Sequence, residues 1–158
     1  MFIQNCKKLF LAFGVTFLTA LIGSLLTSSA VTTWYQTINR PSFTPPNWLF
    51  GPAWTTLFIL MALAWFLILK TGPTNKYYKT ANYIFIIQLL LNAFWSFLFF
   101  YLQNPFLAML EIIVFWLVLV LNFTYFYRIN KKAAWLFVPY IAWVSFAAFL
   151  TYSIWRLN

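Results

Sequence analysis

Five apolar runs take up most of this 158-residue sequence. An α-helix needs about 20 mostly apolar residues to cross the hydrocarbon core of a bilayer. The runs come close to that length, and Glu111 is the single charged residue inside any of them. We therefore predict an all-α integral membrane protein, a five-transmembrane-helix bundle that forms a single domain over residues 1–158, with helices at about 9–28, 53–69, 80–102, 105–127 and 133–155.

Composition agrees with this class and excludes several kinds of chemistry. Hydrophobic residues make up 64% of the chain and charged residues 7%, against about 45–50% and 25% in soluble domains. No His, one Cys and one acidic residue exclude a zinc cluster, a Ser-His-Asp or Cys-His arrangement and paired-carboxylate hydrolysis. We therefore expect no metal site.

The first apolar run has two interpretations. Ser28, Ser29 and Ala30 resemble a signal-peptide cleavage site, but a run of about 20 residues exceeds the usual 7–15 of a signal peptide and favours a retained helix. Small residues recur every fourth position at Thr16, Ala20, Ser24 and Ser28. Such a ridge allows another helix to pack closely.

The distribution of basic residues predicts an orientation. The net charge is +9, but the cations lie at the ends of the apolar runs and form no stripe of the kind that binds nucleic acid. By the positive-inside rule, the N-terminus is cytoplasmic and the C-terminus outside. The bias suits a bacterial cytoplasmic membrane, with the mitochondrial outer membrane as the alternative. Eight basic residues fall on the predicted inner side (Lys7, Lys8, Lys70, Lys76, Lys79, Arg128, Lys131, Lys132) and two, Arg40 and Arg156, on the other.

The connection over residues 29–52 is neither apolar enough for lipid nor polar enough for a plain linker. It contains Pro41, Pro45 and Pro46, and Pro52 closes it; prolines remove backbone donors and interrupt helices and central strands. Its aromatic surface is also larger than a solvated loop would expose. We predict a stiff folded loop that caps the outer end of the bundle.

Polar and aromatic residues inside the spans converge below this cap. Gln88, Asn92 and Ser96 share one helix face, although Asn92 and Ser96 could also bond across helices. Glu111 lies about two turns below the outer surface and could accept hydrogen bonds from the loop, pair with Arg40 or face a ligand. With Trp54, Trp95, Trp143 and Ala147 at similar depth, the pattern predicts a pocket for a large, flat, apolar ligand that stacks on aromatic rings.

A family resemblance joins these residues. Trp34-Tyr35, Arg40-Pro41-Ser42-Phe43, Pro45-Pro46-Asn47-Trp48 and Phe50-Gly51-Pro52-x-Trp54 resemble the signature of the translocator protein family (TspO/MBR), also called tryptophan-rich sensory proteins or peripheral benzodiazepine receptors. The resemblance continues through Gln88-Leu89-x-x-Asn92-x-x-Trp95, Ala108 with Glu111, and Pro139-Tyr140-x-x-Trp143-x-x-Phe146-Ala147. Phe43, Ala93-Phe94 and Thr151 depart from common family residues.

The resemblance implies a membrane receptor or sensor, usually a homodimer, with a pocket under the first loop. Family members bind porphyrins such as protoporphyrin IX and haem, isoquinoline carboxamide and benzodiazepine drugs, and in animals cholesterol. By position, the implied ligand-binding residues are Trp34, Pro45, Trp54, Asn92, Trp95, Trp143 and Ala147. Leu150, Tyr152 and Arg156 also fit a weak sterol-binding pattern, which equally describes a helix that ends in an aromatic and basic belt.

Three functions follow as hypotheses. The first is porphyrin binding for sensing, with the porphyrin as ligand and no cofactor required. The second is degradation of the bound porphyrin with light and oxygen, with Trp143 and Trp54 as electron donors. The third is transport of a porphyrin or sterol, which has less support because no polar path crosses the inner half of the bundle beyond Gln88.

Overall fold

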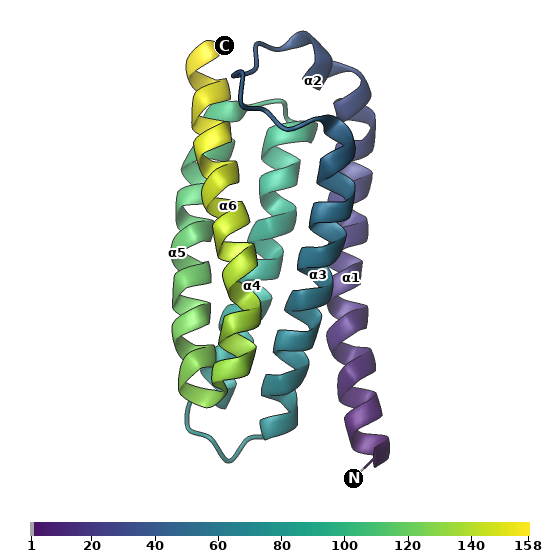
Figure 1. Ribbon diagram of the computed structural model, residues 1–158, viewed down its shortest axis with the longest axis vertical. Helices are drawn as coiled ribbons and strands as arrows, with labels where there is room; N and C mark the ends of the chain where they lie inside the picture. The colour runs from purple at the N-terminus through teal and green to yellow at the C-terminus, as the bar shows by residue number, and fades with distance from the viewer. Residues whose placement is uncertain (1) are drawn as a thin grey trace.

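The computed structural model describes residues 2–158 and is a bundle of long helices (Figure 1). Five of the helices are long and apolar enough to cross a membrane, so the predicted architecture is confirmed. The elements are α1 (Phe2–Thr32), α2 (Trp34–Thr37), α3 (Asn47–Thr71), α4 (Tyr78–Ser96), the π-helical turn η1 (Phe97–Tyr101), α5 (Pro105–Ile129) and α6 (Lys131–Leu157).

The long helices form a closed ring. α1 packs against α3 and α4, α3 against α6, α6 against α5, and α5 against α4. The N-terminal part of α1 and the connections α3–α4 and α5–α6 lie at one end, which we call the basic end (Figure 1). The C-terminus and the loop between α2 and α3 lie at the other, which we call the capped end.

The cap is shorter than the predicted loop over residues 29–52. α1 continues to Thr32, and α3 begins at Asn47. Residues 29–32 and 47–52 of the predicted loop are therefore helical. Pro52 is the sixth residue of α3, so the helix continues through a proline that cannot donate a backbone hydrogen bond to the Trp48 carbonyl. The hydroxyl of Thr56 donates to the Pro52 carbonyl at 2.9 Å.

Capping residues and a glycine determine where the helices next to the short connections begin and end. The side chain of Asn104 caps α5 by accepting from the Leu107 amide at 3.0 Å, directly before Pro105 at the first helical position. Asn130 caps α6 in the same way through the Ala133 amide. Gly72 ends α3 with φ of 81°, a conformation that glycine adopts without strain. These residues hold the five spans in antiparallel order.

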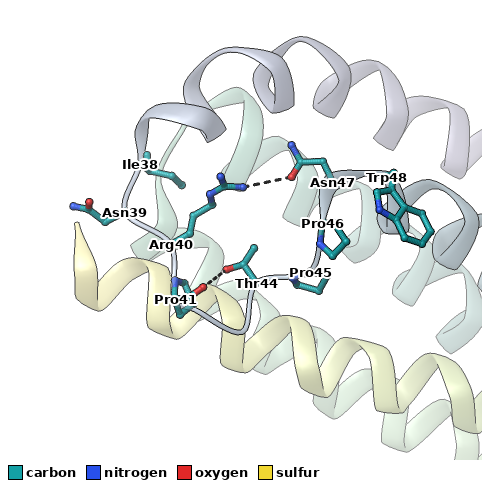
Figure 2. Close-up of a pocket in the computed structure, with 9 residues that line it drawn as sticks. All are labelled: Ile38, Asn39, Arg40, Pro41, Thr44, Pro45, Pro46, Asn47 and Trp48. Carbon is teal, nitrogen blue, oxygen red and sulfur yellow. Dashed lines mark hydrogen bonds between the residues drawn. The ribbon is translucent and has the colours of Figure 1, made fainter.

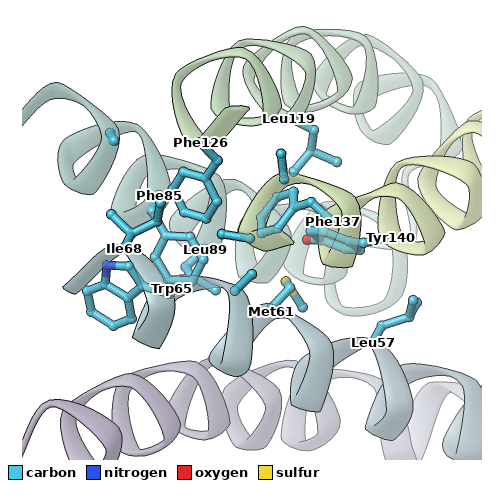
Figure 3. Close-up of a cluster of buried hydrophobic side chains, with 14 of the residues drawn as sticks. Leu57, Met61, Trp65, Ile68, Phe85, Leu89, Leu119, Phe126, Phe137 and Tyr140 are labelled. Atoms are coloured by element: carbon cyan, nitrogen blue, oxygen red, sulfur yellow. The ribbon is translucent and has the colours of Figure 1, made fainter. Parts of the chain in front are cut away.

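The half of the bundle nearer the basic end is filled by aromatic side chains (Figure 3). Trp65 stacks on Phe85 with ring centroids 4.5 Å apart. Phe85 in turn stacks on Phe126, whose ring meets that of Phe137 edge to face at 5.3 Å. All three phenylalanines are fully buried. This packed core supports the hollow half of the bundle that lies nearer the cap.

Candidate functional site

A cavity of about 590 Å³ lies between α1, α3, α4, η1 and α6 below the cap. We call it the inner cavity. Its volume falls within the range of 300–1,000 Å³ that is usual for ligand pockets. Ten aromatic residues belong to its lining: Phe17, Tyr35, Phe50, Trp54, Phe58, Trp95, Phe99, Phe100, Trp143 and Phe146.

Two indoles form one wall of the inner cavity. The rings of Trp54 on α3 and Trp143 on α6 meet edge to face with centroids 6.4 Å apart. Phe50 packs on Trp143 at 6.1 Å, and Trp54 packs on Tyr140 at 6.2 Å. These edge-to-face contacts are the arrangement that aromatic pairs prefer. They hold both indoles in place around an apolar space.

The wall opposite comes from α4 and the π-helical turn that follows it. Trp95 stacks on Phe99 at 5.0 Å, and Phe99 meets Phe100 edge to face at 4.9 Å. The π-helical turn lets two consecutive residues, Phe99 and Phe100, both line the cavity. Turns of this type are frequent at functional sites. The sequence pattern did not reveal it, because the apolar run continues unbroken through η1.

A buried chain of hydrogen bonds lies at the floor of the inner cavity. The Asn92 amide donates to the Tyr140 hydroxyl at 2.9 Å, and that hydroxyl donates to Gln88 Oε1 at 3.2 Å. Asn92 lines the cavity, whereas Gln88 and Tyr140 are fully buried below it. Asn92 therefore both bonds across helices and borders the cavity. Tyr140 was missed as a functional residue, although its place one turn before Trp143 on α6 puts it on the same helix face.

The small residues of α1 both line the cavity and face the neighbouring helices α3 and α4. Ala20, Ser24 and Ser28 belong to the lining, together with Gly23. Thr16 is the one member of the ridge that is fully buried. The ridge thus allows α1 to pack on α3 and α4 at Thr16, and nearer the cap its small side chains leave room for the cavity.

The structure brings together Trp54, Asn92, Trp95, Trp143 and Ala147 around the inner cavity. Trp34 and Pro45 lie outside it. Trp34 packs against Phe99 with centroids 5.6 Å apart, so its ring supports a lining residue. Pro45 borders a second hollow on the outside of the cap.

The three residues of the sterol pattern do not share a surface. Leu150 lines the inner cavity, whereas Tyr152 is 46% exposed and the Arg156 guanidinium lies over the Trp155 ring. The reason is helix geometry, because successive residues are about 100° apart and residues at 150 and 152 face different directions. This placement favours the aromatic and basic belt as the interpretation of Tyr152 and Arg156.

The second hollow, of about 680 Å³, lies within the curve of the loop (Figure 2). We call it the outer cavity; its lining is Ile38, Asn39, Arg40, Pro41, Thr44, Pro45, Pro46, Asn47 and Trp48. Figure 2 shows the Arg40 side chain reaching across the loop, where it donates to Asn47 Oδ1 at 3.4 Å.

Hydrogen bonds fix the loop, both within itself and to α6. The Thr44 hydroxyl donates to the Pro41 carbonyl at 2.7 Å, and the Asn39 amide donates to Asn158 Oδ1 at 2.9 Å, which ties the loop to the end of α6. The Arg40 guanidinium also lies 5.0 Å from the centroid of the Tyr35 ring. Burial raises the pKa of the Tyr35 phenol, and the nearby Arg40 charge opposes that rise. Tyr35 is thus a neutral, buried residue that packs under the loop.

Comparison with known proteins places this arrangement in a family. The TspO/MBR family matches residues 12–156. The chain belongs to the TspO/MBR family. Among curated relatives, it is 39% identical over 155 residues to "Tryptophan-rich protein TspO" of Chlorobaculum tepidum, which covers 98% of each chain. It is 32% identical to "Tryptophan-rich sensory protein" of Cereibacter sphaeroides (79% of this chain, 77% of the relative) and 30% identical to human "Translocator protein" (87% and 82%).

The family match of this TspO/MBR protein includes every residue that lines either cavity, since those residues run from Phe17 to Ile154. The match therefore covers the cap and the site together.

Glu111 fills none of the three roles considered for it in this TspO/MBR member: acceptor for the loop, partner of Arg40 or ligand-facing residue. It is 8% exposed in α5, a helix that contributes no residue to the lining of the inner cavity. Arg40 bonds to Asn47 at the cap instead of to this carboxylate. Within the described residues, neither Glu111 carboxylate oxygen has a hydrogen-bond partner. Both the pairing with Arg40 and the ligand-facing role are thus replaced by burial inside the bundle.

Proposed function

We propose that this protein is a membrane receptor or sensor that binds a porphyrin, protoporphyrin IX or haem, in the inner cavity. The observation that carries the proposal is the lining of that cavity, where ten aromatic side chains surround about 590 Å³ of mostly apolar space. A large flat ring system has two apolar faces, and stacking on aromatic side chains is the contact that suits it. Few polar groups border the space, as is usual for sites that bind apolar molecules.

The names of the relatives supply the functional class. "Tryptophan-rich sensory protein" and "Translocator protein" are names of proteins that match more than three quarters of this chain. A cavity that ends on a packed core agrees better with sensing than with passage of a ligand through the bundle. The aromatic core around Phe85, Phe126 and Phe137 fills the half of the bundle below the cavity.

Binding should not depend on iron. The sequence has no His, the usual axial ligand of haem in binding proteins. The aromatic walls contact the ring faces equally with and without a metal at the centre. Haem and metal-free protoporphyrin IX therefore fit the inner cavity by the same contacts.

The proposed orientation puts the basic end on the cytoplasmic side of a bacterial membrane and the capped end outside. Eight of the ten basic residues lie in the N-terminal part of α1 or at the α3–α4 and α5–α6 connections. An excess of Lys and Arg is characteristic of cytoplasmic segments. Both cavities then lie nearer the outer surface.

Titration of the purified protein with protoporphyrin IX tests the proposal. Because Trp54, Trp95 and Trp143 line the cavity, bound porphyrin should quench intrinsic tryptophan fluorescence at micromolar concentration, which corresponds to about 8 kcal/mol of binding free energy. The variant Trp54→Phe, Trp143→Phe, followed by porphyrin absorbance, should bind more weakly. Unchanged binding in that variant would defeat the proposal.

A second candidate function is degradation of the bound porphyrin with light and oxygen. The observation that favours it is the Trp54–Trp143 pair in the cavity wall. The light-excited porphyrin accepts an electron from an indole in contact with it and passes that electron to dioxygen, the oxidant. The indole radical cation then regains an electron from the porphyrin ring, so that the porphyrin is oxidised and the indole is restored. The protein then contributes placement and a donor, while the ligand supplies the reactivity.

A further inference from the structure

The inner and outer cavities share a wall. Asn47, the first residue of α3, lines both of them. Tyr35 lines the inner cavity, and its other neighbour is the Arg40 guanidinium of the outer cavity. The Asn47 amide and the Tyr35 phenol therefore lie between lining residues of the inner cavity and the Arg40 cation. Arg40 contacts both of these side chains.

Arg40 has a weak partner in this arrangement. Its hydrogen bond to Asn47 Oδ1 is 3.4 Å long, beyond the usual 2.7–3.2 Å for an N–H donor. That acceptor is a neutral amide, and the one acidic side chain in the sequence, Glu111, is buried in α5. A guanidinium presents a planar fork of donors that matches a carboxylate. The outer cavity thus offers a partly exposed cation whose neighbouring side chains, Asn47 and Tyr35, are neutral.

We propose that the outer cavity receives the carboxylates of a ligand whose flat apolar body occupies the inner cavity. This inference rests on the proposed porphyrin binding and defines its ligand class as ring systems with acid groups along one edge. A carboxylate takes the place of Asn47 Oδ1 as the acceptor for Arg40. The Asn47 side chain turns aside, so that the shared wall opens where the two cavities meet. Arg40 is then the residue that selects acidic over neutral ligands.

The test compares protoporphyrin IX, which carries two carboxylates, with its dimethyl ester, which carries none. Both are titrated in detergent against the wild-type protein, Arg40→Gln and Arg40→Lys. Wild type should prefer the diacid. Arg40→Gln should bind the diacid roughly tenfold more weakly, as expected for one lost charge-assisted hydrogen bond, and should bind the ester as wild type does. Arg40→Lys keeps the charge and should keep a preference for the diacid.

Arg128→Gln is the matched control, because the Arg128 guanidinium lies over the Tyr77 ring at the basic end much as Arg40 lies over Tyr35. It should leave both affinities unchanged. Equal losses for diacid and ester in Arg40→Gln would show that Arg40 only holds the loop, and the inference would be overturned. It would also be overturned if wild type bound the two compounds equally, although porphyrin binding would then stand. If wild type bound neither compound, the proposed function would fail with it.

Discussion

The indoles of Trp54 and Trp143 meet edge to face across the wall of the inner cavity, at a centroid distance of 6.4 Å and an interplanar angle of 81°. The two residues are 89 positions apart in sequence and belong to neighbouring helices, α3 and α6. A flat ligand in this cavity lies against at least one of them.

This pair leads to a prediction about photochemistry. If the bound porphyrin is degraded in light, Trp143→Phe alone should abolish the degradation while measurable binding survives, because Phe keeps part of the apolar contact, Trp54 is unchanged, and the electron-donating indole is lost. Porphyrin absorbance is followed under illumination, with a dark sample beside it. Trp135→Phe is the control, since Trp135 is 62% exposed on α6 away from the cavity. Equal bleaching in all variants, or turnover in the dark, would rule out this role for Trp143.

The hydrogen-bond chain under the cavity predicts a loss of stability. Tyr140→Phe removes the hydroxyl that joins Asn92 to Gln88. The buried side-chain amides of Asn92 and Gln88 then lose this hydrogen-bond partner. Interhelical hydrogen bonds in membranes contribute about 0.6–2 kcal/mol, so the midpoint of thermal unfolding should fall by about 2–6 °C. Tyr83→Phe, at a side chain that is 70% exposed, should not change it. An unchanged midpoint for Tyr140→Phe would show that the chain contributes nothing to stability.

The sequence predicted the five spans because each combines length with a nearly complete lack of charge. It also predicted that Trp54, Asn92, Trp95, Trp143 and Ala147 meet, since depth along antiparallel helices follows from counting residues. These five residues do line one cavity.

Features that depend on the detailed path of the backbone could not be predicted from the sequence pattern. The helix α3 begins at Asn47, earlier than the predicted start at residue 53, because the prolines up to Pro52 suggest a loop while the helix continues through Pro52. Trp34 was assigned to the pocket, yet it packs behind Phe99, because a short helix such as α2 turns its side chains in a way that spacing does not reveal. The role of Tyr140 depends on partners from another helix, which no local pattern contains.

The proposed orientation predicts which loops an impermeant thiol reagent reaches. In a Cys6→Ser background, Ser42→Cys in the cap should be labelled in intact cells, because the capped end faces outward. Thr74→Cys in the α3–α4 connection should be labelled only after lysis. Both positions are exposed, so access to the reagent depends on the side of the membrane. The reverse pattern would invert the topology.

Iron should have little influence on affinity. Haem and metal-free protoporphyrin IX are compared by equilibrium titration against the same preparation, and their dissociation constants should agree within about threefold, a difference of less than 1 kcal/mol. Stacking on the cavity walls is the same for both rings. A strong preference for haem would reveal an axial ligand and contradict the proposed mode of binding.

Filling the inner cavity tests the central claim most directly. Ala147 lines the cavity, whereas Ala142 is exposed on another side of the same helix, so Ala147→Phe and Ala142→Phe add the same side chain in two different places. Protoporphyrin IX is titrated against both variants and wild type, with absorbance as the readout. We predict that Ala147→Phe weakens binding by on the order of tenfold or more, which is at least about 1.4 kcal/mol, and that Ala142→Phe binds as wild type does. Wild-type affinity in a folded Ala147→Phe variant would contradict the account, because the porphyrin would then bind elsewhere.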